Sequence, residues 1–150
     1  MTLTIEDASP EHLEMLYQIE RECFGKEAFT KRQIAQLLAD YNSVSLIAKI
    51  DGEVVGFVIG TISVHRNALN GHIITIDALP KYRRKGIGKT LLQEVEHIFT
   101  EKGAKISYLE VKENNLAAIG LYKKMGYKRI GKLDRYYGDV NGIYLRKILI

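Results

Sequence analysis

Cysteine, proline and tryptophan are scarce in this 150-residue sequence, which contains one, two and none of them respectively. Because Cys23 has no second cysteine to pair with, an internal disulfide is excluded, as are the small secreted folds that several disulfides hold together. Neither Cys23 nor the four histidines have the spacing of zinc ligands, so no metal site is expected. A reducing, cytoplasmic setting fits these absences.

Long hydrophobic runs are also missing from the sequence. No apolar stretch approaches the roughly 20 residues needed to cross a bilayer, and residues 1–7 lack the basic region and apolar stretch of a signal peptide. We therefore expect no membrane partner. With 46% hydrophobic and 27% charged residues, the chain has the composition of a globular protein, and its length predicts one domain over 1–150.

The net charge of +4 favours anionic partners only weakly. Nucleic-acid-binding proteins usually spread basic residues along a face or a tail, whereas the densest basic cluster here is short. We therefore expect a local anion site and no nucleic-acid partner. The cluster consists of Lys81, Arg83, Arg84, Lys85 and Lys89.

Hydrophobic periodicity predicts an alternation of strands and helices. The turn Asp51-Gly52 between two apolar runs predicts a hairpin, and the strand–helix–strand unit from 73 to 111 favours one parallel pair. The predicted fold is α/β (α+β), a mixed, mostly antiparallel sheet of about seven strands with about four helices. The expected strands cover 2–6, 44–50, 53–64, 71–78, 105–111, 127–133 and 141–150, and the expected helices begin at Ser9, cover 31–38, run from 87 until Gly103, and cover 116–125.

The most informative segment is 74–90, where a strand leads into a basic turn and then an amphipathic helix. Free amides at a helix start, together with the helix dipole, favour a bound anion, and Gly86 and Gly88 allow a phosphate to approach the backbone. A P-loop is excluded because Arg83 stands where its first glycine is needed, and Leu91 excludes the dinucleotide fingerprint. The alternative is a capped surface helix with a solvated basic turn.

The pattern Arg83-x-x-Gly86-x-Gly88 after Pro80 resembles motif A of the GNAT superfamily of N-acetyltransferases, and the run L-E-V-K-E-N-N-L-A-A-I-G-L-Y-K-K-M-G-Y over 109–127 resembles motif B. Within that superfamily it is most similar to the ribosomal-protein-alanine acetyltransferases and the catalytic subunits of N-terminal acetyltransferase A. The resemblance implies acetyl-CoA as cofactor and a splayed sheet whose fourth and fifth strands part to admit its pantetheine arm.

The resemblance also implies which residues bind the cofactor. The Ala78 N–H is expected to face the thioester carbonyl as an oxyanion-hole donor, although the family usually has a branched residue there. Asn115 is expected to bond the pantetheine region. The implied cofactor-binding residues are Ile76, Asp77, Ala78, Arg83, Arg84, Lys85, Gly86, Ile87, Gly88, Lys89, Asn115 and Tyr122.

Two residues are candidates for proton transfer. Glu110 lies between Leu109 and Val111, and strand alternation puts it on the opposite face, where the splayed sheet opens into the cleft and a base is needed. The resemblance implies that Tyr122 protonates the departing thiolate. The alternatives are a solvent-facing strand glutamate and a core tyrosine.

Residues for the acceptor are expected in two places. The loop from Phe24 to Phe29 is the acceptor-side loop, where Glu27 attracts an amine, and the paired Tyr136 and Tyr137 frame the entry. A solvated loop acid and strand-pairing aromatics are the alternatives. The turn 138–142 departs from the Gly-Glu-Asp-like turn of the amino-terminal enzymes. His72 is interpreted as structural.

The leading hypothesis is transfer of acetyl to the N-terminal α-amino group of a protein or peptide. A second is acetylation of lysine side chains or small, polyamine-like amines, because one fold hosts all of these acceptors. A non-catalytic acyl-CoA-binding protein and a nucleic-acid or nucleotide binder are the remaining alternatives. A monomer or a homodimer is expected.

Overall fold

A seven-stranded sheet forms the centre of the structure, a computed structural model that describes residues 2–150. Its strand order is β1-β2-β3-β4-β5-β7-β6, and every neighbouring pair is antiparallel except β4 and β5. The predicted mixed, mostly antiparallel sheet is thus confirmed. The strands are β1 Leu3–Asp7, β2 Ser43–Ile50, β3 Glu53–His65, β4 Ala68–Ala78, β5 Ile106–Lys112, β6 Lys128–Tyr137 and β7 Val140–Ile148.

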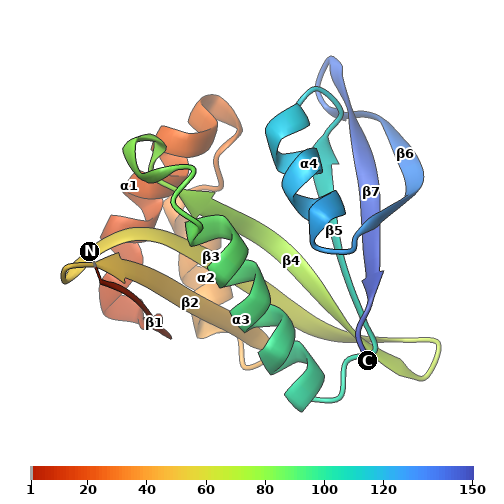
Figure 1. Ribbon diagram of the computed structural model, residues 1–150, viewed down its shortest axis with the longest axis horizontal. Coiled ribbons are helices and arrows are strands. Elements are labelled where there is room, and N and C mark those ends of the chain that lie inside the picture. The colour runs from red at the N-terminus through yellow and green to blue at the C-terminus, as the bar shows by residue number, and fades with distance from the viewer. Residues whose placement is uncertain (1) are drawn as a thin grey trace.

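Helices cover both faces of this sheet (Figure 1). The helices α1 and α2 pack against Ile47, Phe57 and Ile59 on one face, while α3 packs on the other face over the larger part of the core. Among the described residues, no helix is long and apolar enough to cross a membrane. The helices are α1 Leu13–Phe24, α2 Lys31–Ala39, α3 Ile87–Glu101 and α4 Leu116–Lys124, with short 3-10 helices η1 Pro10–His12, η2 Gly25–Glu27 and η3 Pro80–Tyr82.

Two hairpins extend further than the hydrophobic pattern predicts. Strands β3 and β4 continue to a two-residue turn at Arg66 and Asn67, whose φ angles of 52° and 64° give the left-handed geometry that suits tight hairpins. Strand β6 likewise reaches Tyr137, four residues beyond the expected end, before a turn at Gly138-Asp139. The hydrophobic pattern did not predict these extensions, because Asn70 and Gly71 in β4 and the exposed Asp134 and Arg135 in β6 interrupt the apolar positions.

Strands β4 and β5 pair over three residues only, from Asn70 to His72 on β4 and from Ile106 to Tyr108 on β5. Beyond this point the two strands diverge, as Figure 1 shows. The core closes the paired end, because Phe99 of α3 is fully buried against Gly60 and Gly71 of the sheet. The opposite end of the two strands remains parted, which confirms the predicted splay.

The glycine at position 71 is needed for this packing. A Cβ atom there lies 2.2 Å from the Phe99 ring, which has no room to move. We predict that Gly71→Ala lowers the free energy of unfolding by about 1–3 kcal/mol, as overpacking does, when measured by urea denaturation. Gly120→Ala in α4 is the control, because its added Cβ meets no atom within 4 Å. Equal stability of Gly71→Ala and wild type contradicts the described contact.

Candidate active site

The loop from Arg83 to Gly86 and the first turn of α3 form the predicted anion site. Gly86 is the N-cap residue and has φ 79°, which favours glycine. The first hydrogen bond of the helix runs from the Thr90 N–H to the Gly86 carbonyl at 2.9 Å, so the amides of 87–89 have no acceptor within the helix. The buried Ile87 side chain fixes this turn to the core, while Arg84, Lys85 and Lys89 are exposed around it.

These groups fit a pyrophosphate chemically, because free amides at a helix start and mobile basic side chains are the donors that such anions use. Gly88 lies beside α4, where a Cβ atom comes within 3.4 Å of Leu121. Arg83 differs from its neighbours, because its Nε–H donates to the Ala78 carbonyl at 3.3 Å. It therefore joins the basic loop to the end of β4.

The predicted pantetheine strand, Ile76 to Ala78, has one edge occupied and one edge at the split. Its occupied edge pairs with β3, where Gly56 lies opposite Ala78. The edge toward β5 has no strand partner among the described residues, since pairing ends at His72. The Ala78 carbonyl also accepts from the Cys23 thiol at 3.3 Å. An extended amide-bearing group can pair with this free edge as an added strand does.

Glu110 lies beside His72 at the point where β4 and β5 part. Glu110 Oε1 is 2.8 Å from His72 Nε2, and their side chains are 14% and 23% exposed. The His72 ring stacks on Tyr108 with centroids 4.3 Å apart, and Tyr108 stacks on Tyr144 at 5.3 Å. Leu109 and Val111 face the α3 core, so the predicted orientation of Glu110 is confirmed. A carboxylate beside an imidazole in this way can orient the ring and stabilise its charged form when the ring accepts a proton.

His72 therefore belongs to the candidate site, which its interpretation as a structural histidine missed. No local sequence signal could have found it, because the contact depends on the pairing register of β4 with β5, which places His72 opposite Tyr108. Strand alternation then puts Glu110 on the same face as Tyr108.

Tyr122 of α4 lies on the α3 side of the split and is 7% exposed. Burial, followed by the nearby Asp77, raises the pKa of its phenol above the ordinary value of 10. The hydroxyl therefore keeps its proton at neutral pH and is available as a donor. Glu110 and Tyr122 thus approach the split from opposite faces of the sheet.

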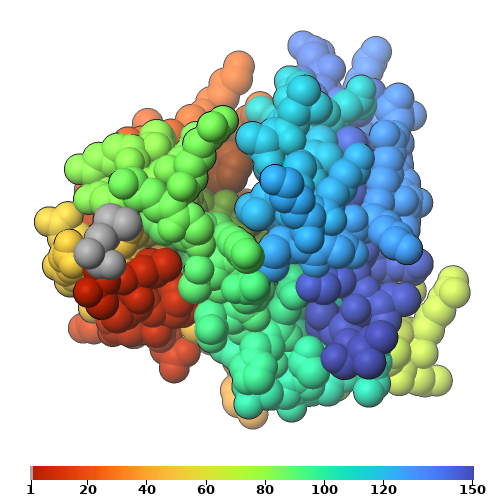
Figure 2. Space-filling view, viewed as in Figure 1, coloured from red at the N-terminus to blue at the C-terminus, as the bar shows by residue number. Residues whose placement is uncertain are grey.

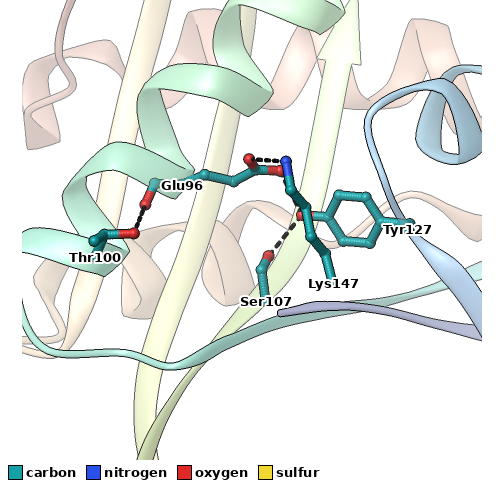
Figure 3. Close-up of polar contacts among 5 residues, drawn as sticks. All are labelled: Glu96, Thr100, Ser107, Tyr127 and Lys147. Carbon is teal, nitrogen blue, oxygen red and sulfur yellow. Dashed lines mark hydrogen bonds and ion pairs between the residues drawn. The ribbon is translucent and has the colours of Figure 1, made fainter. Parts of the chain in front are cut away.

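A buried polar network positions Tyr127 (Figure 3). The Tyr127 ring packs edge-on against Tyr122, with centroids 5.9 Å apart. The Tyr127 hydroxyl donates to Glu96 Oε2 at 2.8 Å, and Lys147 donates to Glu96 Oε1 at 2.7 Å. Ser107 lies 2.7 Å from the same hydroxyl and completes the network. These contacts join α3, β5 and β7 behind Tyr122.

The predicted acceptor-side loop and the paired tyrosines lie together. Both line a groove of about 630 Å³, and an ion pair between Glu27 and Lys112 joins the loop to β5. The groove lies on the Glu110 face of β5, because Lys112, two residues along the strand, pairs with Glu27 and lies 6.0 Å from the Tyr137 ring. Burial, followed by the charge of Glu110, raises the pKa of Tyr136. The lining residues are Lys26, Glu27, Tyr136, Tyr137, Gly138, Asp139 and Val140.

Phe24 and Asn115, the remaining predicted residues, lie at the ends of helices. Phe24 ends α1 and is 39% exposed, outside the residues that line the groove. Asn115 is the N-cap of α4, and its Oδ1 accepts from the Ala118 N–H at 3.2 Å. Only its amide nitrogen remains to donate to a bound molecule.

The space-filling view shows a hollow between the green segment that precedes α3 and the cyan helix α4 (Figure 2). The hollow is bordered by the segment that leads into α3 and by α4, the helix that carries Tyr122. The groove at Tyr136 and Tyr137 lies on the other face of the sheet, where Lys112 contacts Glu27 and the Tyr137 ring two residues along β5 from Glu110. One site can thus receive an anionic, extended molecule from one face and an amine from the other.

Comparisons with known proteins agree with this geometry. The model of the Acetyltransferase (GNAT) family matches residues 13–127. An N-alpha-acetyltransferase of Sulfurisphaera tokodaii is 38% identical over 117 residues, which cover 72% of this chain and 70% of that protein. An N-alpha-acetyltransferase of Saccharolobus solfataricus is 29% identical over 151 residues, which cover 95% of this chain and 90% of that protein.

Solved structures give the same result for the fold. Ard1 from Thermoplasma volcanium superposes with a TM-score of 0.88 at 27% identity, over 100% of this chain and 99% of that one. The ribosomal-protein-S18-alanine N-acetyltransferase from Escherichia coli also has a TM-score of 0.88, at 22% identity, over 99% of this chain and 94% of that one. Together with the parted strands and the helix start that fits a pyrophosphate, these matches show that the chain belongs to the GNAT family of acetyltransferases.

Proposed function

We propose that this enzyme transfers an acetyl group from acetyl-CoA to the N-terminal α-amino group of a protein or peptide. The observation that supports it best is the groove between the acceptor-side loop and Tyr136-Tyr137, which lies on the Glu110 face of β5. An open groove between two loops accommodates a chain end that continues away from the reacting amine. The relatives named N-alpha-acetyltransferases match most of this chain.

The cofactor's phosphates are assigned to the amides of Gly86 to Lys89, with Arg84 and Lys85 adding charge, and its amide-bearing arm to the free edge of β4 from Ile76 to Ala78. The exposed basic loop and the unpaired strand edge support this assignment. When bound, acetyl-CoA supplies the acetyl group as an activated thioester.

The protein's own side chains are assigned the proton transfers. Glu110 takes a proton from the acceptor amine, directly or through His72, whose Nε2 it contacts. The Tyr122 Oη supplies a proton to the leaving sulfur, because burial keeps its phenol protonated. The Ala78 N–H is assigned to the carbonyl oxygen of the thioester.

An acceptor screen tests this function. The purified protein is incubated with acetyl-CoA and a panel of peptides with free or blocked N-termini, lysine-containing peptides and polyamines, and the products are identified by mass spectrometry. We expect acetylation of free N-termini only. Products confined to lysine side chains or polyamines favour the alternative acceptors, and the absence of CoA release with every acceptor favours a non-catalytic acyl-CoA-binding protein.

We also propose that the protein acts in the cytoplasm, as a monomer or a homodimer. The single cysteine supports a reducing, cytoplasmic setting. A monomer or a homodimer is distinguished by light scattering of the purified protein at several concentrations.

Tyr122→Phe removes the proposed donor and little else, because Phe fills the same buried volume. We predict that kcat falls about 10²- to 10⁴-fold, the usual contribution of a general acid, while the KM for acetyl-CoA changes little. Steady-state kinetics with CoA detection measure both. Tyr41→Phe is the matched control, because Tyr41 is 97% exposed. An unchanged kcat removes Tyr122 from the mechanism.

Glu110 and His72 act as one unit if the proton passes between them. Glu110→Gln and His72→Asn are each expected to lower kcat/KM by about 10²-fold or more, and the double variant is expected to lose little beyond either single one, since residues of a unit are not additive. Glu113→Gln, an exposed neighbour, is the control. Fully additive losses contradict the coupled role of His72.

A further inference from the structure

Three polar side chains are buried together between α1 and β4, apart from the proton-transfer residues. Glu20, Thr75 and Asp77 are 1%, 6% and 2% exposed. The Thr75 hydroxyl oxygen lies 2.8 Å from Glu20 Oε1 and 2.7 Å from Asp77 Oδ1. Two carboxyl groups thus meet at one hydroxyl inside the protein.

Counting protons shows that both carboxyl groups cannot be ionised. A threonine hydroxyl has one proton, so it can donate to only one of two carboxylates. The second short contact is a hydrogen bond only if that carboxyl carries a proton and donates to the Thr75 oxygen. Two like charges brought together in a buried site have the same consequence, because only one of them ionises readily.

Asp77 is the group that holds this proton. Its Oδ2 atom is buried and has no hydrogen-bond partner among the described residues. Burying an oxygen without a hydrogen-bond partner costs far less free energy when it is the carbonyl oxygen of a neutral acid than when it belongs to a carboxylate. Burial, and then the charge of Glu20, raise the pKa of Asp77 well above its ordinary value. The hydrogen bonds therefore run from Asp77 through Thr75 to Glu20.

The other oxygen of Glu20 links this chain of hydrogen bonds to the acceptor-side loop. Glu20 Oε2 accepts from the Phe29 N–H at 3.0 Å, at the end of the loop that begins at Phe24. The same loop is held to β5 by Glu27 and Lys112. The loop that lines the acceptor groove is thus attached to β4 by Glu20, next to the residues assigned to the thioester.

We propose that Glu20, Thr75 and Asp77 are positioning residues that share one proton and hold the acceptor-side loop at Phe29 against β4, so that binding of the acceptor depends on them. The part of this proposal that concerns acceptor binding rests on the proposed function, whereas the part that concerns the shared proton does not. None of these three residues is required to touch the acceptor, because Glu20 acts through the loop backbone.

Four other charged or titratable groups lie around Asp77. Glu20 and Cys23 face it from α1, Arg83 from the basic loop, and Tyr122 from α4. Burial raises the pKa of Cys23 to about 11, and the pKa of Tyr122 is raised as well. Arg83 favours the ionised form of Asp77, but burial and Glu20 outweigh it.

The first experiment measures urea unfolding from pH 5 to pH 9 without donor or acceptor. A raised folded pKa means that the native state binds a proton that the unfolded state has lost. The resulting stability is complete below the unfolded pKa and is lost as the pH rises through the folded pKa. Relative to Asp77→Asn, the wild-type unfolding constant is expected to rise by up to about tenfold per pH unit.

The Asp77→Asn variant keeps the shape of the protonated Asp77 side chain without its charge, because the Asn amide donates to Thr75 and its carbonyl oxygen replaces Oδ2. The control is Asp7→Asn, because Asp7 is exposed at the end of β1 and its substitution leaves the wild-type pH dependence unchanged. If wild type and Asp77→Asn have parallel pH dependences, the shared proton does not exist and the proposal is overturned.

The second experiment tests the loop. Glu20→Met keeps the volume but removes both acceptors, so amide hydrogen exchange of Phe29 is expected to accelerate about ten- to a hundredfold, as for a lost hydrogen bond to a charged group. The peptide KM is expected to rise by a similar factor, with the KM for acetyl-CoA unchanged. Glu20→Gln retains an acceptor for Phe29 and is expected to restore both, while Glu22→Met, exposed on the same helix, is the control.

Unchanged exchange at Phe29 in Glu20→Met overturns the attachment of the loop, and equal rises in both KM values overturn the specific effect on the acceptor. If Glu20→Met does not fold, Glu20→Gln and Asp77→Asn still decide the shared proton by unfolding. A wild-type protein that acetylates no peptide contradicts the proposed function alone, because unfolding and exchange are measured without substrates.

Discussion

The parting of β4 and β5 after three paired residues is the constraint on which the rest of the site depends. Unpaired backbone groups inside a sheet are costly unless another partner satisfies them, so the free edge of β4 is a place for a ligand with amide groups. The paired end is closed by Phe99 against Gly71 and by the Glu96–Tyr127 network. Because that end is fixed, the divergence positions His72 and Glu110 where the two strands separate.

Buried carboxyl groups surround this split, and each has a different partner. Glu96 is paired with the Lys147 ammonium and the Tyr127 hydroxyl, which suits an ionised group that only supports structure. Glu110 contacts the His72 ring, which can exchange a proton with it. Asp77 shares a hydroxyl with Glu20 and therefore tends to be neutral. The partner of each carboxyl, more than its burial, thus separates the structural Glu96 from Glu110, for which proton transfer is proposed, and from Asp77, for which a retained proton is proposed.

The sequence predicted the parts of this arrangement that local patterns encode. The hairpin at Asp51-Gly52, the helix start at Gly86 and the orientation of Glu110 follow from turn chemistry and strand alternation, and all three are present. The contact between His72 and Glu110 was missed because the register of two parallel strands joined by a helix leaves no local signal. Glu20 lies at helical spacing from Leu16 and Cys23, so its inward position follows from periodicity. Its contact with Thr75 was missed because it joins segments 55 residues apart and leaves no local signal.

The charges of the acceptor groove bear on which amine it receives. Glu27 is neutralised by Lys112, and Lys26 and Asp139 carry opposite charges on the same lining. A polyamine with several positive charges therefore gains no net attraction from the groove walls. A peptide end brings a single α-ammonium, so its binding depends less on such an attraction. The electrostatic balance of the groove thus favours a chain end over a polycation, which agrees with the acceptor proposed from the groove's shape.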